Sequence, residues 1–145
     1  MNPKNNPSNL SYYRLLLMDF LHESHPKLIR DEKFIAARTG ATLDAYEQAV
    51  HSGSNPLEAA HFANEVLFNG LHFSKHDTLK QILWNEFSTE IPEDEAAEWA
   101  IRLLSHCEAV FSNYPLSDDF AYSSEYDLLY TELTGTIAIL LENQE

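Results

Sequence analysis

Apolar residues recur every three or four positions through most of the chain, and this spacing predicts amphipathic helices. The densest pattern covers residues 55–87. Asn55 can cap a first helix, and Gly70 can end that helix in the left-handed backbone conformation. Ser74 and Asp77 have the spacing of a capping box that begins a second helix. Because a short turn joins the two helices, this stretch is predicted to form a central helical hairpin.

Three further helices are predicted before the hairpin. The first, residues 11–24, is apolar round most of its circumference, which indicates a helix in the middle of a bundle. A second helix is predicted over residues 26–39 and is expected to end at Gly40. Thr42 is expected to cap a third, short helix.

Two more helices are predicted after the hairpin. One follows the acidic run at residues 93–95, where negative charge suits a helix N-terminus. The last follows Ser124, which has the capping-box spacing with Asp127. No stretch of useful length alternates as a strand would. The pattern therefore predicts an all-α, compact single-domain bundle of six to seven helices around the central hairpin.

Length and composition predict one domain over residues 1–145, with residues 1–8 as a loose N-terminal arm. Cys107 is the single cysteine, which excludes an internal disulfide and a multi-cysteine zinc site. The N-terminus lacks the basic and apolar regions of a signal peptide, and the longest apolar run is too short to span a membrane. A soluble cytoplasmic protein without a cofactor is expected.

Charge is distributed very unevenly along the chain. Residues 1–82 carry a balance of −1, whereas residues 83–145 carry one basic residue, Arg102, against fourteen acidic residues. A DNA-binding protein neutralises phosphates with clustered Lys and Arg, so this acidic half argues against direct nucleic-acid binding. It also argues against interpreting the hairpin as a DNA-reading helix-turn-helix.

Three sequence blocks carry a resemblance to a known family. They are LSYYRLLLMDFLHESHP near the start, NEVLFNGLHFSKHDTLKQILWNEF in the middle and LSDDFAYSSEYDLLYTELTG near the end. Together they resemble an uncharacterised domain-of-unknown-function family, number 1896, of gut Bacteroidetes. The resemblance implies a single-domain protein without an assigned activity, and a link to mobile genetic elements. It supplies no catalytic residues.

Four residues are weak candidates for metal ligands. Glu58 and His61 have the Glu-x-x-His spacing of di-iron helix bundles, but such sites need this motif twice. His72 and His76 resemble a ligand pair, yet the predicted cap places them in different elements. A buried, hydrogen-bonded His76 is the favoured interpretation, and no metal is expected.

Enzyme motifs are weak throughout. His106 and Cys107 are neighbours on a predicted helix and point about 100° apart, so their side chains do not meet. An inert, buried thiol is the expected state of Cys107. Neither a nucleophile elbow nor a glycine-rich phosphate loop is present in the sequence. The protein is therefore expected not to be an enzyme.

A stretch that mixes aromatic rings with carboxylates is the main candidate for an interaction site. Such a surface suits a cationic partner, through carboxylate–Arg pairs and cation–π contacts. An equally weighted alternative is a solvated loop whose rings fill the core beneath it. The candidate interaction residues are Asp118, Asp119, Phe120, Tyr122, Glu125, Tyr126 and Asp127.

Three functions remain open from the sequence. The preferred hypothesis is a non-enzymatic acidic protein that docks on a basic protein surface, in its sharpest form as a mimic of nucleic acid. The first alternative is a small-ligand or metal-binding helical domain that uses the histidines of the central hairpin. The second is a structural homo-oligomer with exposed aromatic residues, such as Trp84 or Tyr130, at its seam.

Overall fold

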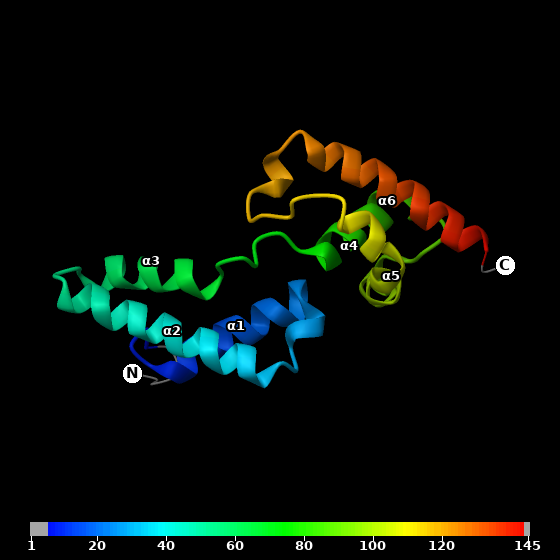
Figure 1. Cartoon of the computed structure of the whole chain (residues 1–145). Coiled ribbons are helices and arrows are strands. Elements are labelled where there is room, and N and C mark those ends of the chain that lie inside the picture. The colour runs from blue at the N-terminus through cyan, green and yellow to red at the C-terminus, as the bar shows by residue number, and fades with distance from the viewer. Residues whose placement is uncertain (1–5, 144–145) are drawn as a thin grey trace. The chain divides into compact units, whose positions relative to one another are not determined.

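A computed structural model describes residues 6–143 and shows an all-α protein (Figure 1). Three 3-10 turns accompany six α-helices in this part of the chain, which confirms the all-α prediction and the helix number. Within the described residues, no helix has the length and apolar character needed to cross a bilayer. The helices are α1 (Leu10–Ser24), α2 (Glu32–His51), α3 (Pro56–Leu67), α4 (Lys75–Glu86), α5 (Ala96–Phe111) and α6 (Glu125–Glu142).

The helices divide into two compact units, each with its own core. Unit 1 is Met1–Leu71 and contains α1, α2 and α3, whereas unit 2 is His72–Glu145 and contains α4, α5 and α6. That residues 1–145 form a single domain stays a prediction, because the division into two units does not test it. Of the predicted loose arm, residues 1–5 lie outside the described part, and residues 6–8 form a turn in which the Ser8 N–H donates to Asn6 Oδ1.

The core of unit 1 forms between α2 and its two neighbours. The α2 and α3 helices lie side by side and make the most extensive helix pair of the structure (Figure 1). Ala59, Ala63 and Leu67 recur every four residues and form the buried stripe of α3. Small alanine side chains let the two helix axes approach closely, so α3 can pack against α2 with little bulk between them.

The α1 helix buries one stripe rather than its whole circumference. Tyr13, Leu17 and Leu21 are fully buried, whereas Leu15 is 48% exposed. The prediction of a helix enclosed in the middle of a bundle is therefore wrong. Only α2 is a major packing partner of α1 among the described helices, so the apolar residues outside the stripe meet solvent or lie at its edges.

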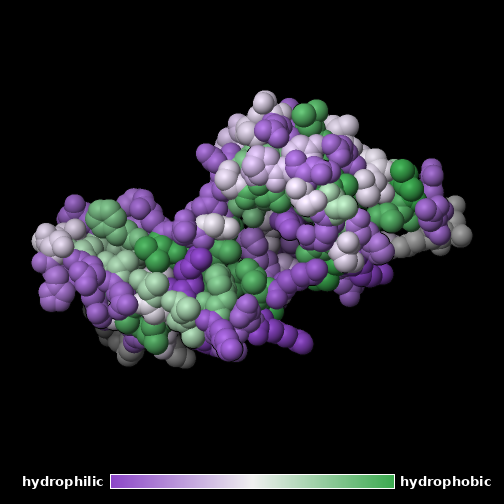
Figure 2. Space-filling model, viewed as in Figure 1, coloured by the Kyte–Doolittle hydropathy of each residue, from purple (hydrophilic) through white to green (hydrophobic). Residues whose placement is uncertain are grey.

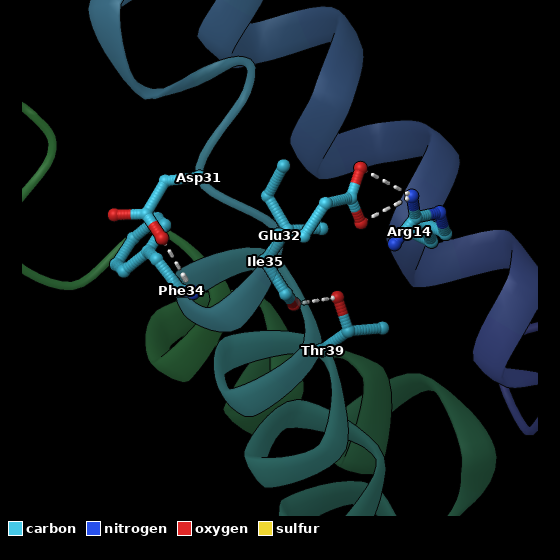
Figure 3. A network of polar contacts seen from close by, with 6 residues as sticks. All are labelled: Arg14, Asp31, Glu32, Phe34, Ile35 and Thr39. Carbon is cyan, nitrogen blue, oxygen red and sulfur yellow. Dashed lines mark hydrogen bonds and ion pairs between the residues drawn. The ribbon is translucent and has the colours of Figure 1, made fainter.

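The α2 helix begins later than predicted (Figure 3). Pro26 opens a 3-10 turn, Pro26–Leu28, in place of the predicted helix start. The helix itself starts at Glu32, where the Asp31 carboxylate accepts a hydrogen bond from the Phe34 N–H at 3.1 Å. An ion pair of 2.9 Å between Arg14 Nη2 and Glu32 Oε2 joins this first turn to α1.

The α2 helix also runs through the position where a break was predicted. Gly40 lies in the helix interior and does not adopt a positive φ, and Thr42 is buried within the helix instead of capping a new one. The Thr42 hydroxyl donates to the Arg38 carbonyl at 2.7 Å, which satisfies it inside the core. A glycine costs a helix only about 1 kcal/mol, and the apolar face that includes Tyr46 continues past Gly40 and offsets this cost.

The core of unit 2 forms where α4, α5 and α6 meet. Its largest buried side chains come from all three helices, and α6 contacts both α4 and α5. The predicted solvent face of α5, including Glu98 and Arg102, is exposed. Core residues of this unit include Leu79, Ile82, Leu83, Leu103, Phe111, Leu129, Leu133 and Ile137.

The two helices of the predicted central hairpin belong to different units. The α3 helix packs chiefly against α2, and α4 packs chiefly against α5. The predicted turn at Gly70 and the predicted cap at Ser74 are nevertheless confirmed. Gly70 has φ +77°, and the Ser74 hydroxyl accepts a hydrogen bond from the Asp77 N–H at 2.9 Å. Periodicity identifies the apolar face of each helix but not the helix that covers it, which is why the packing partners differ from the prediction.

One predicted capping box is absent. Ser124 immediately precedes α6, but its backbone is helical, with φ −66° and ψ −22°, and its side chain makes no capping hydrogen bond. An N-cap residue needs an extended backbone for its side chain to reach the following N–H groups. The expectation for Ser124 and Asp127 is therefore wrong. At α3, by contrast, Asn55 and Glu58 form a complete capping box.

Candidate interaction site

Three of the aromatic residues in the acidic-aromatic stretch contribute to the core. Phe120 is 2% exposed, and its ring makes edge contacts with Phe73, Tyr114 and Tyr126 at centroid distances of 5.4, 5.9 and 6.3 Å. The Tyr114 hydroxyl donates to the Glu132 carboxylate of α6. For Phe120 and Tyr126, the structure places the rings as the alternative interpretation expected, beneath the loop rather than on it.

Tyr122 is the exception, because its side chain is 91% exposed. It lines a shallow hollow of about 270 Å³ together with Pro115, Asp119 and Glu125. The 3-10 turn Phe120–Tyr122 explains this arrangement, because its first residue points into the core and its third points outward. The structure thus brings four of the seven candidate residues, Asp119, Phe120, Tyr122 and Glu125, around one hollow, named here the Tyr122 hollow.

The acidic candidates also have structural contacts. Asp118 Oδ1 accepts a hydrogen bond from the His72 N–H at 3.1 Å and so ties the loop to the start of unit 2. Asp119 Oδ1 accepts from the Ser117 hydroxyl at 2.8 Å. Glu125 and Asp127 occupy the first turn of α6, where the helix dipole favours negative charge.

The charge asymmetry of the sequence follows the division into units. Unit 1 carries six Lys and Arg against eight Asp and Glu, whereas unit 2 carries three against fifteen. Each of the three cations of unit 2 has a local contact. Lys75 pairs with Glu108 at 3.0 Å, Lys80 pairs with Asp77 at 3.3 Å, and the Arg102 guanidinium lies over the Trp99 ring at 4.6 Å. Most carboxylates of unit 2 therefore have no cation near them among the described residues.

Many of the acidic residues of unit 2 belong to two separate groups. The first surrounds the Tyr122 hollow at the N-terminal end of α6. Glu90 and Glu142 line another hollow with Phe87 and Leu141, which places the α4–α5 connection beside the other end of α6. From residue 125 to residue 142 a helix rises about 25 Å, so the groups are well apart. The second group, named here the α4–α5 acidic segment, consists of the exposed Glu86, Glu90, Glu93, Asp94, Glu95 and Glu98.

The α4–α5 acidic segment was not singled out as a site from the sequence. The signal was available, because six acidic residues occur between positions 86 and 98. The sequence prediction uses only the run at residues 93–95, as charges that favour a helix start. Trp84, which is next to this segment, donates from its ring N–H to the Glu93 carbonyl at 3.3 Å.

The structure does not bring the metal candidates together. Glu58 Oε1 accepts from the Asn55 N–H, and His61 Nε2 lies 3.1 Å from Glu65 Oε1, both on the solvent face of α3. His72 and His76 belong to unit 2, where His76 is 4% exposed and its Nε2 donates to the Ala97 carbonyl at 3.1 Å. No group of three potential ligands occurs within residues 6–143.

Cys107 is a buried thiol of α5, as predicted. Burial, with a smaller contribution from the charge of Glu108, raises its pKa to about 11. A thiol with such a pKa is almost entirely protonated at neutral pH and is a poor nucleophile. This geometry gives Cys107 a packing role.

Fold and site together define an all-helical protein with a strongly acidic unit and an aromatic-lined acidic hollow. The family comparison identifies it further, because the family model "Domain of unknown function (DUF1896)" matches residues 5–145. The chain belongs to this family, as the three sequence blocks indicated.

A solved structure supports the fold. The chain is similar to the crystal structure of protein PG0816 from Porphyromonas gingivalis, with 44% sequence identity and a TM-score of 0.90. The similarity covers 93% of this chain and 92% of that one. No curated protein matches the chain.

Proposed function

We propose that the protein is a non-enzymatic interaction protein whose unit 2 docks on a basic protein surface at the Tyr122 hollow. The observation that carries this proposal is the exposed ring of Tyr122 beside Asp119 and Glu125, in a unit whose three cations all have local contacts. A ring that is 91% exposed contributes little to folding, so its position among carboxylates is better suited to binding than to stability.

The chemistry of the hollow suits an arginine or lysine side chain. Two carboxylates can accept charge-assisted hydrogen bonds from a guanidinium, and a tyrosine face attracts a cation within about 6 Å. Uncompensated negative charge on the rest of unit 2 would speed the encounter with a basic partner, and salt would slow it.

A mimic of nucleic acid is not part of this proposal. Phosphate mimicry needs rows of carboxylates nearly as dense as phosphates, which lie about 1.7 Å apart along a duplex axis. The two acidic groups of unit 2 are separated along α6 instead. The link to mobile genetic elements, which the family resemblance implied, rests on no described residue and is likewise left aside.

The test is a pull-down from an extract of the native host at low and at moderate salt. The wild-type chain is compared with the variant D118N/D119N/E125Q/D127N. A matched control, E93Q/D94N/E95Q/E98Q, removes the same charge from the α4–α5 acidic segment. A partner that the wild type and the control retain, and that the first variant and added salt release, supports docking at the Tyr122 hollow.

A second variant separates binding from folding, because Asp118 also holds the backbone of His72. Tyr122→Ala combined with D119N and E125Q leaves that bond in place. If this variant keeps every partner of the wild type, docking at the Tyr122 hollow is ruled out. Equal loss with the control variant would show that general charge, rather than this site, holds the partner.

A further inference from the structure

The solvent face of α3 in unit 1 carries two large apolar side chains that are exposed. Leu57 is 82% exposed and Phe62 is 48% exposed, and both line a hollow of about 510 Å³. Figure 2 shows hydrophobic side chains at the surface over α3. Single exposed apolar residues are common, but two large ones around one hollow indicate a surface for binding. The residues that line it are Leu57, Glu58, Ala60, His61, Phe62 and Asn64, named here the α3 face.

The geometry of the α3 face is that of a helix-docking surface. Leu57 and His61 are four residues apart and form its central ridge, and the other lining residues flank this ridge on both sides. The opposite side of α3, with Ala59 and Ala63, is already buried against α2. The backbone N–H and C=O groups of α3 form hydrogen bonds within the helix. A partner can therefore bind the side chains of this face but cannot add a strand to it.

The charge of α3 selects the kind of occupant. Glu58 and Glu65 are exposed on α3, and residues 39–71 contain no Lys or Arg. The neighbouring cation, Arg38, donates to the carbonyls of Leu67 and Asn69 at 3.1 and 2.7 Å, at the C-terminal end of α3. An apolar hollow with acidic residues on the same helix is complementary to a helix with one apolar and one basic face.

We propose that the α3 face binds a basic amphipathic helix of another protein. A second copy of this chain is a poor occupant, because each copy carries a net charge of −14 and the copies repel one another. Apolar residues of the bound helix contact Leu57 and Phe62, and its Lys and Arg side chains pair with Glu58 and Glu65. This site is separate in sequence and in chemistry from the Tyr122 hollow, so it adds to the proposed function and does not depend on it.

The test uses a synthetic probe, since the natural partner is unknown. The probe is a fluorescent peptide of about 14 residues, made of Leu and Lys with Leu at helical spacing on one face. A scrambled peptide of equal composition, in which no apolar face forms, is the control. Binding to the full chain is measured by fluorescence anisotropy. We expect the amphipathic peptide to bind and the scrambled one to bind at least about tenfold more weakly.

Matched variants locate the binding. Leu57→Ser and Phe62→Ser should each weaken binding of the amphipathic peptide several-fold, and E58Q/E65Q should reduce its salt dependence. Leu128→Ser changes a leucine of α6 that is also exposed and should leave binding unchanged. Circular dichroism checks that each variant keeps the helical fold.

Several results would overturn the proposal. Equal binding of both peptides would mean that the protein recognises only their charge. Unchanged binding of the amphipathic peptide by Leu57→Ser and Phe62→Ser would mean that it contacts another surface. Self-association of the wild type that Leu57→Ser abolishes would make a second copy the occupant. The D118N/D119N/E125Q/D127N variant should still bind the peptide, which separates failure at the α3 face from failure at the Tyr122 hollow.

Discussion

Neighbouring residues of one 3-10 turn have opposite roles in this protein. Phe120 fills the core of unit 2, and Tyr122, two positions later, extends into solvent. Replacing Phe120 by Ala should lower the free energy of unfolding by about 3 kcal/mol, because a buried ring is lost and a cavity remains. Tyr122→Ala is the matched control and should change stability by less than about 0.5 kcal/mol. Urea denaturation measures both.

A large stability loss in Tyr122→Ala would contradict this assignment. It would mean that the exposed ring contributes to folding, and the argument that it is available for a partner would then lose its basis. A small loss of stability in Phe120→Ala would likewise show that the contacts of its ring with Phe73, Tyr114 and Tyr126 do not hold the loop in place.

Tyr114 gives unit 2 a dependence on alkaline pH. Its hydrogen bond to the Glu132 carboxylate, with added effects of burial and nearby negative charge, raises its pKa to about 12. An unfolded tyrosine has a pKa of about 10. Since the folded pKa is the higher one, the protonated form is favoured by folding, and this stabilisation is complete below pH of about 10 and lost toward 12.

The stability difference between the wild type and Tyr114→Phe should therefore shrink as the pH rises through this interval. Urea denaturation at several alkaline pH values measures it. Tyr13, whose pKa is also raised to about 12 by burial, is present in both proteins and so cancels in the comparison. A difference that stays constant over the interval would show that the Tyr114 hydroxyl does not donate to Glu132 in solution.

At the scale of the elements, two glycines differ in backbone conformation, because one lies inside a helix and the other in a turn. Gly40 lies within α2, and Gly70, with φ +77°, follows α3. An added Cβ would meet nothing within 4 Å at either position, so only the backbone decides the outcome. Gly40→Ala should raise the free energy of unfolding by about 0.5–1 kcal/mol, and Gly70→Ala should lower it by about 1 kcal/mol. Thermal or urea unfolding distinguishes these signs.

Destabilisation by Gly40→Ala would indicate that α2 is interrupted at this position, as the sequence alone suggested. That prediction relied on the local preference of glycine and threonine. Local preferences of about 1 kcal/mol are easily exceeded by an apolar face that continues across them, and a threonine can satisfy its own hydroxyl within a helix.

The helices themselves could be predicted from the sequence because periodicity and caps are local signals. Asn55, Gly70 and Ser74 were each placed correctly on that basis. The pairing of helices is not local, and so the packing of α3 with α2 and of α4 with α5 was missed.

The candidate site could be predicted only in part, for a similar reason. The loop that carries it has no helical period, so the sequence could not show which rings point inward. The structure brings Asp119, Tyr122 and Glu125 around one hollow, whereas Phe120, which belongs to the same prediction, has its ring in the core. An interaction role for these residues stays a prediction. The α3 face was not predicted, because helical periodicity shows that Leu57 and Phe62 are apolar positions of a helix but not that they are exposed.

At the scale of the whole molecule, the two units should respond differently to salt. Unit 2 has fifteen acidic and three basic residues, whereas unit 1 is nearly balanced. Like charges repel more strongly in the compact state than in the unfolded chain. Salt screens this repulsion, because the Debye length is only about 10 Å at 0.1 M ionic strength. Added sodium chloride should therefore slow amide hydrogen exchange in α4 more than in α2.

Exchange in the buried turns of α2 is the internal control for this prediction. Equal slowing in both helices would mean that the units open together, which would support a single cooperative domain over residues 1–145. Faster exchange in α4 at higher salt would contradict the idea that charge repulsion weakens unit 2.

The placement of the cations has a consequence for how the surface of unit 2 can be altered after synthesis. Arg102 is the last basic residue, so neither Lys nor Arg occurs in residues 103–145, which include the Tyr122 hollow and α6. Trypsin-like proteases have no bond to cut there, and acetylation has no amine to modify. Modification of lysine therefore cannot change the charge of this surface.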